Sequence, residues 1–274
     1  MSARKLAMIS YRGLQLAFVA LVAGQFFVDY PFSWWWVFLP LVLSCGIVVA
    51  LGRSTAAEQG ADPRPPVEVG VPVTGRWSAL NSPADKVPSH GTHAYGQTYA
   101  IDLVAEPEEG GRPAFRSLWP LVRRNRDFPA FGEPLIAVAD ATVVHATDWR
   151  RDHLSRNSLP ALFCLMLVEA PIRDMGGAGW VTGNHIVLDL GDGTYAMYAH
   201  LQRGSLTVRA GDKVRAGQEI ARCGNSGNST EPHVHFQLMD GPDLDSARGV
   251  PFRWRGIGVP PGGEAFTVER QPAP

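Results

Sequence analysis

The sequence contains little cysteine and almost no excess charge of either sign. Its 274 residues include three cysteines, Cys45, Cys164 and Cys223, which lie far apart and form no C-x-x-C pair. This pattern speaks against a disulfide scaffold and a thiolate zinc site, although it is compatible with a single disulfide. The net charge is −1, whereas a nucleic-acid binder usually carries an excess of basic residues that contact phosphates. We therefore expect no nucleic-acid partner. With 45% hydrophobic residues, the chain is also too apolar for disorder.

Apolar residues are concentrated in the first fifth of the chain. No charged residue occurs over 13–28 or over 30–52, and Asp29 separates the two runs. One helix over both runs would be about 60 Å long, twice the hydrocarbon thickness of a bilayer. The turn at Asp29-Tyr30-Pro31 instead predicts two membrane helices, about 7–28 and 32–51, with Trp34–Trp36 at an interface and Arg12 snorkelling. We therefore predict a membrane anchor over residues 1–53.

The alternative for this region is a secretory signal peptide, because Arg4, Lys5 and Arg12 precede an apolar run. The second apolar run and the lack of a clear small-residue cleavage site favour an uncleaved anchor in the cell membrane. Positive residues flank both outer ends of the hairpin, with Arg53 following the second run. Taken alone, this charge pattern places both ends in the cytoplasm.

Beyond an extended linker expected over 54–72, the composition predicts a mainly β domain over 73–274. Short alternating runs occur at 98–104, 135–145, 185–190, 194–200, 206–208, 219–222 and 233–239. Gly191-Asp192-Gly193 between two of these runs predicts a hairpin. We therefore expect an antiparallel sheet in a sandwich or partly closed barrel. Insertions are expected near 106–131 and 149–179, the second with a helix at 159–168.

Five histidines lie in polar contexts next to turns: His90, His93, His200, His233 and His235. The last two form a His-x-His pair after a Gly/Asn/Ser loop, and alternation along a strand points both to the same face. Asp102 follows His90 and His93 in the sequence, on what resembles an adjoining hairpin. A catalytic zinc takes three protein ligands and keeps one position for water. Two of these histidines and Asp102 would supply such a site.

Four pieces of sequence occur in an order that resembles a known family. They are a His upstream of Tyr99-Ala100-Ile101-Asp102, the run 183–188, Tyr198-Ala199-His200-Leu201, and 224–236 ending in Pro-His-Val-His-Phe. Together they resemble the lysostaphin/LytM-type zinc endopeptidases, which cut peptide cross-bridges or stems of bacterial peptidoglycan. The resemblance covers about 81–239, interrupted by the two insertions. It implies a barrel-sandwich hydrolase domain that binds one Zn²⁺ ion and hydrolyses peptidoglycan peptides through a zinc-activated water.

The resemblance makes Asp102 and His235 zinc ligands, together with an upstream histidine. The shortest family form places that histidine four residues before the aspartate, where this chain has Thr98. His90 and His93 are the candidates. We favour His90, because Ser89-His90-Gly91 resembles the longer-spaced members.

The same resemblance makes His200 and His233 the catalytic histidines that are not ligands. His233 would act as general base, and His200 would stabilise the oxyanion or protonate the leaving amine. His185 is expected to be a packing or rim residue and Cys223 a small core residue.

Two other function classes are alternatives. One is a catalytically inactive LytM-like module that binds cell wall or a partner protein; such modules usually lack a metal or catalytic position, whereas here all can be filled. The other is a phosphocarrier or lipoyl-like domain, which explains neither Asp102 nor the His-x-His pair. Peptidoglycan chemistry places the catalytic domain outside the cytoplasm, in conflict with the charges that flank the hairpin.

Overall fold

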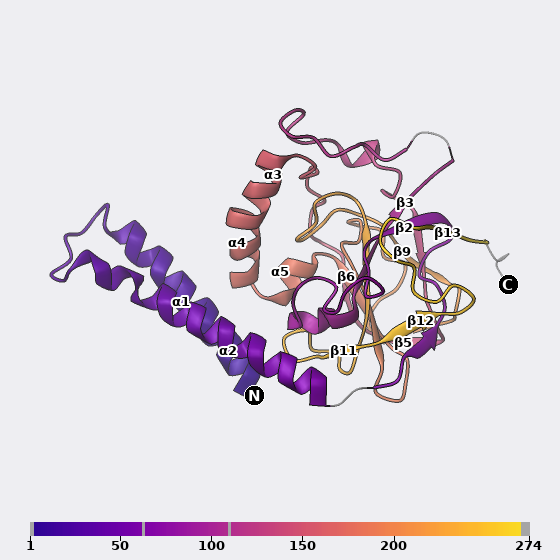
Figure 1. The fold of residues 1–274 in the computed structure, drawn as a ribbon, viewed down its shortest axis with the longest axis horizontal. Coiled ribbons are helices and arrows are strands. Elements are labelled where there is room, and N and C mark those ends of the chain that lie inside the picture. Colours follow the sequence, from indigo (N-terminus) through magenta and orange to yellow (C-terminus); the bar gives the residue numbers. More distant parts are fainter. Residues whose placement is uncertain (1–2, 62–63, 109–110, 270–274) are drawn as a thin grey trace.

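The computed structural model describes residues 3–61, 64–108 and 111–269, in which a helical hairpin projects from a β-rich domain (Figure 1). The helical elements are α1 (Ala3–Gly24), η1 (Trp34–Phe38), α2 (Leu39–Ala61), η2 (Ala94–Tyr99), η3 (Asn125–Asp127), α3 (Leu159–Cys164), η4 (Leu165–Glu169), α4 (Ala170–Met175) and α5 (Ala178–Thr182). The strands are β1 (Val67–Val69), β2 (Gly75–Asn81), β3 (Ile101–Ala105), β4 (Pro134–Ile136), β5 (Ala141–Thr147), β6 (His185–Asp189), β7 (Tyr195–Ala199), β8 (Lys213–Val214), β9 (Glu219–Arg222), β10 (Val234–Met239), β11 (Gly249–Val250), β12 (Phe252–Trp254) and β13 (Ala265–Val268).

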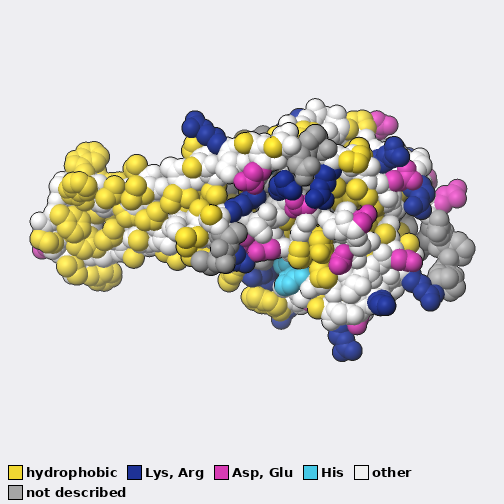
Figure 2. Space-filling view, turned by 90° about the horizontal axis from the view of Figure 1, so that it is seen from below, with side chains coloured by type: hydrophobic (Ala, Val, Ile, Leu, Met, Phe, Trp, Pro, Cys, Tyr) yellow, Lys and Arg dark blue, Asp and Glu magenta, His cyan; other side chains and the backbone are white. Residues whose placement is uncertain are grey.

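The projecting hairpin consists of α1 and α2, and Figure 2 shows an apolar surface over its distal part. Two helical segments, Ala3–Gly24 and Trp34–Ala61, are long and apolar enough to cross a membrane by length and composition. Two helices were expected, but α1 ends at Gly24 rather than at residue 28. Tyr30 folds back there and donates a hydrogen bond to the Leu21 carbonyl at 2.9 Å, and a Cβ on Gly24 would collide with its hydroxyl.

The base of the hairpin is docked on the β domain. Arg12 of α1 does not snorkel as expected, because its side chain is only 9% exposed and forms a 3.0 Å ion pair with Asp245. The same guanidinium donates to the hydroxyl of Tyr95 at 3.1 Å. Lys5 pairs with Asp243 at 2.9 Å. Both ends of the hairpin therefore lie at the domain, and its turn points away.

The stretch expected to be a linker is partly structured. Residues 54–61 continue α2, where Gln59 donates to the Gly249 carbonyl at 2.9 Å. Residues 67–69 form β1, which pairs in parallel with β12. These contacts with the domain supply order that the Pro- and Gly-containing composition did not indicate.

The main sheet has the strand order β13-β2-β3-β10-β7-β6-β5-β8, with every pairing antiparallel and with β11 also paired to β10. This confirms the predicted antiparallel sheet. Within the described residues the sheet does not close into a barrel, because its end strands β13 and β8 each have one partner. The core beneath it includes Trp77, Tyr198, Phe236 and Trp254, none more than 1% exposed.

The turn over residues 191–193 joins β6 to β7 as predicted. The run 135–145 is divided between β4 and β5, because the intervening residues bond to the turn before β9. No strand forms at 206–208.

The second insertion carries the predicted helix. α3, η4 and α4 follow one another without a break over residues 159–175, and Ser158 caps the first turn by accepting from the amide of Ala161 at 3.4 Å. Among the described residues of the first insertion, η3 is the sole regular element.

Candidate metal centre and catalytic cleft

Two adjacent strands bring a carboxylate and an imidazole together in the sheet. Asp102 of β3 lies directly opposite His235 of β10 in the antiparallel register. Nδ1 of His235 is 2.9 Å from Oδ1 of Asp102, and Nε2 of His90 is 2.9 Å from Oδ2 of the same carboxylate. The potential ligand atoms of these three residues lie within 4.8 Å of one another. They form the His90–Asp102–His235 cluster.

His93 lies outside this cluster. Its Nδ1 instead contacts Oγ1 of Thr98, within η2, at 3.0 Å. The loop returns the chain so that His90, twelve residues before Asp102, reaches the carboxylate.

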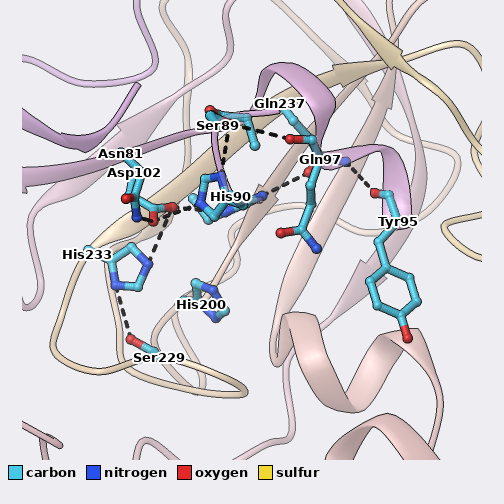
Figure 3. Close-up of polar contacts among 12 residues, drawn as sticks. Asn81, Ser89, His90, Tyr95, Gln97, Asp102, His200, Ser229, His233 and Gln237 are labelled. Carbon is cyan, nitrogen blue, oxygen red and sulfur yellow. Dashed lines mark hydrogen bonds and ion pairs between the residues drawn. The ribbon is translucent and has the colours of Figure 1, made fainter. Parts of the chain in front are cut away.

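Two further histidines surround the cluster (Figure 3). His233 immediately precedes β10, and its Nε2 is 3.6 Å from Oδ1 of Asp102. His200 follows β7, and the centroid of its ring lies 4.8 Å from that of His233. The backbone of His200 has φ = 62°, in the left-handed region that non-glycine residues seldom adopt. Bonds from its amide to Thr182 and from Gly224 to its carbonyl hold this conformation.

Gln237 determines which nitrogen of His235 carries the proton. Its amide nitrogen donates to the carbonyl of Tyr95 at 2.7 Å, so its Oε1 is the atom that faces Nε2 of His235, at 2.8 Å. Because an amide oxygen can only accept, the proton resides on Nε2. The lone pair of Nδ1 therefore points at Asp102.

Ser89 likewise determines which nitrogen of His90 carries the proton. Its hydroxyl donates to the carbonyl of Ala100 at 2.6 Å, so its oxygen accepts from Nδ1–H of His90 at 3.0 Å. The lone pair of Nε2 in His90 is thereby directed at Oδ2 of Asp102.

His200 and His233 are held by backbone carbonyls. Nδ1–H of His233 donates to the carbonyl of Glu231 at 2.8 Å, and Nδ1–H of His200 donates to that of Ser226 at 2.8 Å. Each Nε2 is left as the basic nitrogen. Burial lowers the pKa of His200 well below its ordinary value, with His233 and His235 contributing in the same direction, so this imidazole is neutral.

The protonation pattern leaves several lone pairs converging on one point. Burial raises the pKa of Asp102, but the imidazoles of His90 and His233 outweigh it, and the pKa lies well below the usual range. The carboxylate is therefore ionised, and Asn81 orients it by donating to Oδ2 at 2.8 Å. A cation placed among these donor atoms would satisfy them. Two imidazoles and one carboxylate fit a catalytic zinc ion.

The five residues lie in a cleft of about 840 Å³. One side is formed by the β domain. Other parts of its lining come from the hairpin, through Tyr11 and Leu51, and from the second insertion, through Met166 and Asp174. The hairpin is therefore part of the cleft.

Other residues with reactive side chains have structural surroundings. His185 is 3% exposed and stacks on His145 with ring centroids 4.7 Å apart. His153 contacts the carbonyl of Gly227 at 2.8 Å. Cys223 is a buried core residue, and all three cysteines are free.

Sequence reasoning missed the groups that orient the site, namely Asn81, Ser89 as a hydrogen-bond partner, and Gln237. Gln237 carried a signal, because the alternation that places His233 and His235 on one face of β10 continues to it. Asn81 carried none, since it approaches Asp102 only through the irregular pairing of β2 with β3.

Comparisons with known proteins agree with these motifs over part of the chain. The profile of Peptidase family M23 matches residues 172–246. The glycyl-glycine endopeptidase ALE-1 of Staphylococcus capitis is 41% identical over 83 residues, which cover 27% of this chain and 22% of that protein. Lysostaphin of Staphylococcus simulans is 43% identical over 74 residues, covering 27% of this chain and 14% of that protein.

The peptidoglycan DD-endopeptidase ShyA of Vibrio cholerae is 39% identical over 57 residues, covering 21% of this chain and 13% of that protein. Among solved structures, the catalytic domain of lysostaphin from Staphylococcus simulans has a TM-score of 0.33 and 22% identity, over 63% of this chain and 84% of that one. The curated relatives are therefore matched over less than a quarter of their length. The match contains His200, His233 and His235, and the chain carries a domain of peptidase family M23.

Proposed function

We propose that this protein is a membrane-anchored zinc metalloendopeptidase that hydrolyses peptide bonds of bacterial peptidoglycan. The observation that carries the proposal is the convergence of the His90–Asp102–His235 cluster with His200 and His233 in one cleft. Relatives named as a glycyl-glycine endopeptidase and a peptidoglycan DD-endopeptidase support the substrate class.

His90, Asp102 and His235 would hold the zinc ion. When bound, zinc supplies Lewis acidity that polarises the scissile carbonyl and lowers the pKa of water. Asn81, Ser89 and Gln237 keep the three ligands in place. Ser89 and Gln237 accept from the ring nitrogens that do not face Asp102, and Asn81 donates to Oδ2 of the carboxylate.

His233 acts as the general base. Its Nδ1–H is fixed on a backbone carbonyl, so the basic Nε2 is the nitrogen directed at the site, 3.6 Å from Asp102. It takes the proton of the attacking water. His200 is neutral in the free site and must carry a second proton, on Nε2, to donate to the oxyanion or to the leaving amine. The proton that His233 removes from the water supplies it.

The anchor positions this domain outside the cytoplasm, where peptidoglycan is found. The paired charges at the base of the hairpin lie on the same side as the domain, since Lys5 and Arg12 are bound to Asp243 and Asp245. Protease accessibility on spheroplasts measures the side directly. Digestion of the domain in intact spheroplasts supports an extracytoplasmic location, and protection until lysis contradicts it.

Zinc content and hydrolysis together test the activity. The full chain is expected to contain one zinc ion, to release peptides from purified peptidoglycan, and to lose both properties after chelation. His235→Ala is expected to lose zinc. A preparation without stoichiometric zinc refutes the enzyme, whereas zinc without hydrolysis points to an inactive module that binds cell wall or a partner.

A further inference from the structure

The outer face of the helix column formed by α3, η4 and α4 is apolar. Each exposed residue from 159 to 172 is apolar: Leu159, Pro160, Phe163, Cys164, Met166, Leu167, Val168, Pro171 and Ile172. Leu167 is 72% exposed and Phe163 is 61% exposed, while Ala161 and Leu165 face the protein. A helix on the surface of a soluble domain normally has the opposite arrangement, with polar residues outward. Met166 and Pro171 line the cleft, and we call the other seven residues the apolar column face.

The polar groups of the column are already paired within the protein. Glu169, its one carboxylate before Asp174, binds Arg156 at 2.6 Å and Arg173 at 2.7 Å. Glu169 therefore does not add a charge to the outer face of the column, and this face exposes apolar side chains to solvent.

The apolar surface continues into the first insertion. Leu118 and Trp119 are 70% and 77% exposed. Their loop is tied to the start of the column, because the amide of Leu159 donates to the carbonyl of Arg116 at 3.1 Å and Ser158 donates to that of Leu121 at 2.7 Å. Both insertions therefore add exposed apolar side chains to one region.

The column lies at the level where the uncharged part of the hairpin begins. Tyr11 of α1 donates to Asp174 of α4 at 2.7 Å, and the charge-free run starts at Gly13, two residues later. Figure 1 shows the column crosswise to the hairpin, on the side of the domain from which the hairpin projects. If the hairpin enters a bilayer at Gly13, the surface of that bilayer lies against the column.

We propose that the apolar column face is a second membrane contact, an interfacial helix that lies in the bilayer surface beside the spanning hairpin. The occupant is lipid, because the face is continuous with the apolar hairpin and has the one-sided composition of helices that bind the headgroup–acyl boundary. This inference rests on the proposed membrane anchor. Since the column and the hairpin also line the catalytic cleft, the contact holds that cleft at the lipid surface.

Cys164 lies on the apolar column face and provides a native reporter position. In the full chain with Cys45→Ser, it is the only exposed cysteine, because Cys223 is buried. The protein is labelled there with an environment-sensitive dye and reconstituted in phosphatidylglycerol–phosphatidylethanolamine vesicles, with or without nitroxide on the upper acyl chain. The expected result is a blue-shifted emission that is lost with nitroxide lipid and resists aqueous iodide. An aqueous, iodide-sensitive label overturns the inference.

Two matched labels give the controls. A label at Arg253→Cys, with the other exposed cysteines changed to serine, reports β12 on the far side of the domain and is expected to stay aqueous (Figure 1). A label at native Cys45, with Cys164→Ser, reports the hairpin. Lipid quenching at Cys45 without quenching at Cys164 refutes the interfacial helix while the anchor stands. No quenching at Cys45 refutes the anchor and the inference together.

A second variant removes the contact without changing the core. Phe163→Glu with Leu167→Glu is expected to abolish lipid quenching at Cys164 while the unfolding temperature in detergent stays unchanged. Quenching that persists contradicts the proposal. Shielding of Cys164 that depends on protein concentration and occurs without lipid indicates a second copy on this face, and also contradicts it.

Discussion

His235 donates a hydrogen bond from Nε2 to Oε1 of Gln237 at 2.8 Å, and this contact leaves Nδ1 as the nitrogen that faces Asp102. Gln237→Leu removes the acceptor, so the imidazole of His235 can adopt the other tautomer or rotate. Outer hydrogen bonds of this kind typically contribute a factor of about 10–100 to metal affinity. We expect a loss of that size in zinc affinity, measured by competition with a chromophoric chelator.

Gln237→Glu is the matched control, because a carboxylate still accepts from His235 although it cannot donate to Tyr95. It is expected to retain more of the affinity than Gln237→Leu. Equal zinc affinity in the wild type and the leucine variant would show that the contact does not position the ligand.

The two upstream histidines are distinguished by their own substitutions. His90→Ala removes a nitrogen that lies 2.9 Å from Asp102, whereas His93→Ala removes one that contacts Thr98. We expect His90→Ala to lose stoichiometric zinc and His93→Ala to retain it, as measured by elemental analysis after dialysis. Zinc loss in the His93 variant alone would reverse the assignment.

His233→Ala separates catalysis from metal binding. Because Nε2 of His233 is the proposed general base and not a ligand, its removal is expected to lower peptidoglycan hydrolysis by about 10²–10⁴-fold while most of the zinc stays bound. The measurement is the rate of peptide release at matched zinc content. Activity close to that of the wild type would assign the base elsewhere.

Much of the fold and site was predictable from local sequence. Alternation placed His233 and His235 on one face of a strand, and the Gly191-Asp192-Gly193 turn correctly joined β6 to β7. These features depend on period and turn chemistry, which neighbouring residues determine.

The contacts between distant segments were not predictable. Arg12 and Asp245 are 233 residues apart, and a positive residue before an apolar run has the same local pattern whether it reaches water or a buried carboxylate. The choice between His90 and His93 likewise depended on how a loop returns to β3. Such contacts follow from tertiary packing, and no periodicity encodes them.

The ion pair between Arg12 and Asp245 should stabilise the docking of the hairpin. Breaking a buried pair by removing one partner costs about 3–5 kcal/mol, because the other charge is left unpaired. We expect Arg12→Ala and Asp245→Ala each to lower the free energy of unfolding in detergent, and the double variant to lose much less than the sum. Additive losses in this double-mutant cycle would show that the two residues do not act as a pair.

His185 should make the protein sensitive to mild acid. Burial lowers its pKa to about 4, from an ordinary value of 6.5, so the unfolded chain takes up the proton first as the pH falls. The stability contributed by the neutral, buried ring is full above pH 6.5 and is lost as the pH falls towards 4, by on the order of 3 kcal/mol. His185→Gln keeps a donor near the Gly183 carbonyl but cannot titrate. Denaturant unfolding at several pH values between 7.5 and 4 is therefore expected to show a shallower loss of stability in this variant, and parallel curves would contradict the assignment.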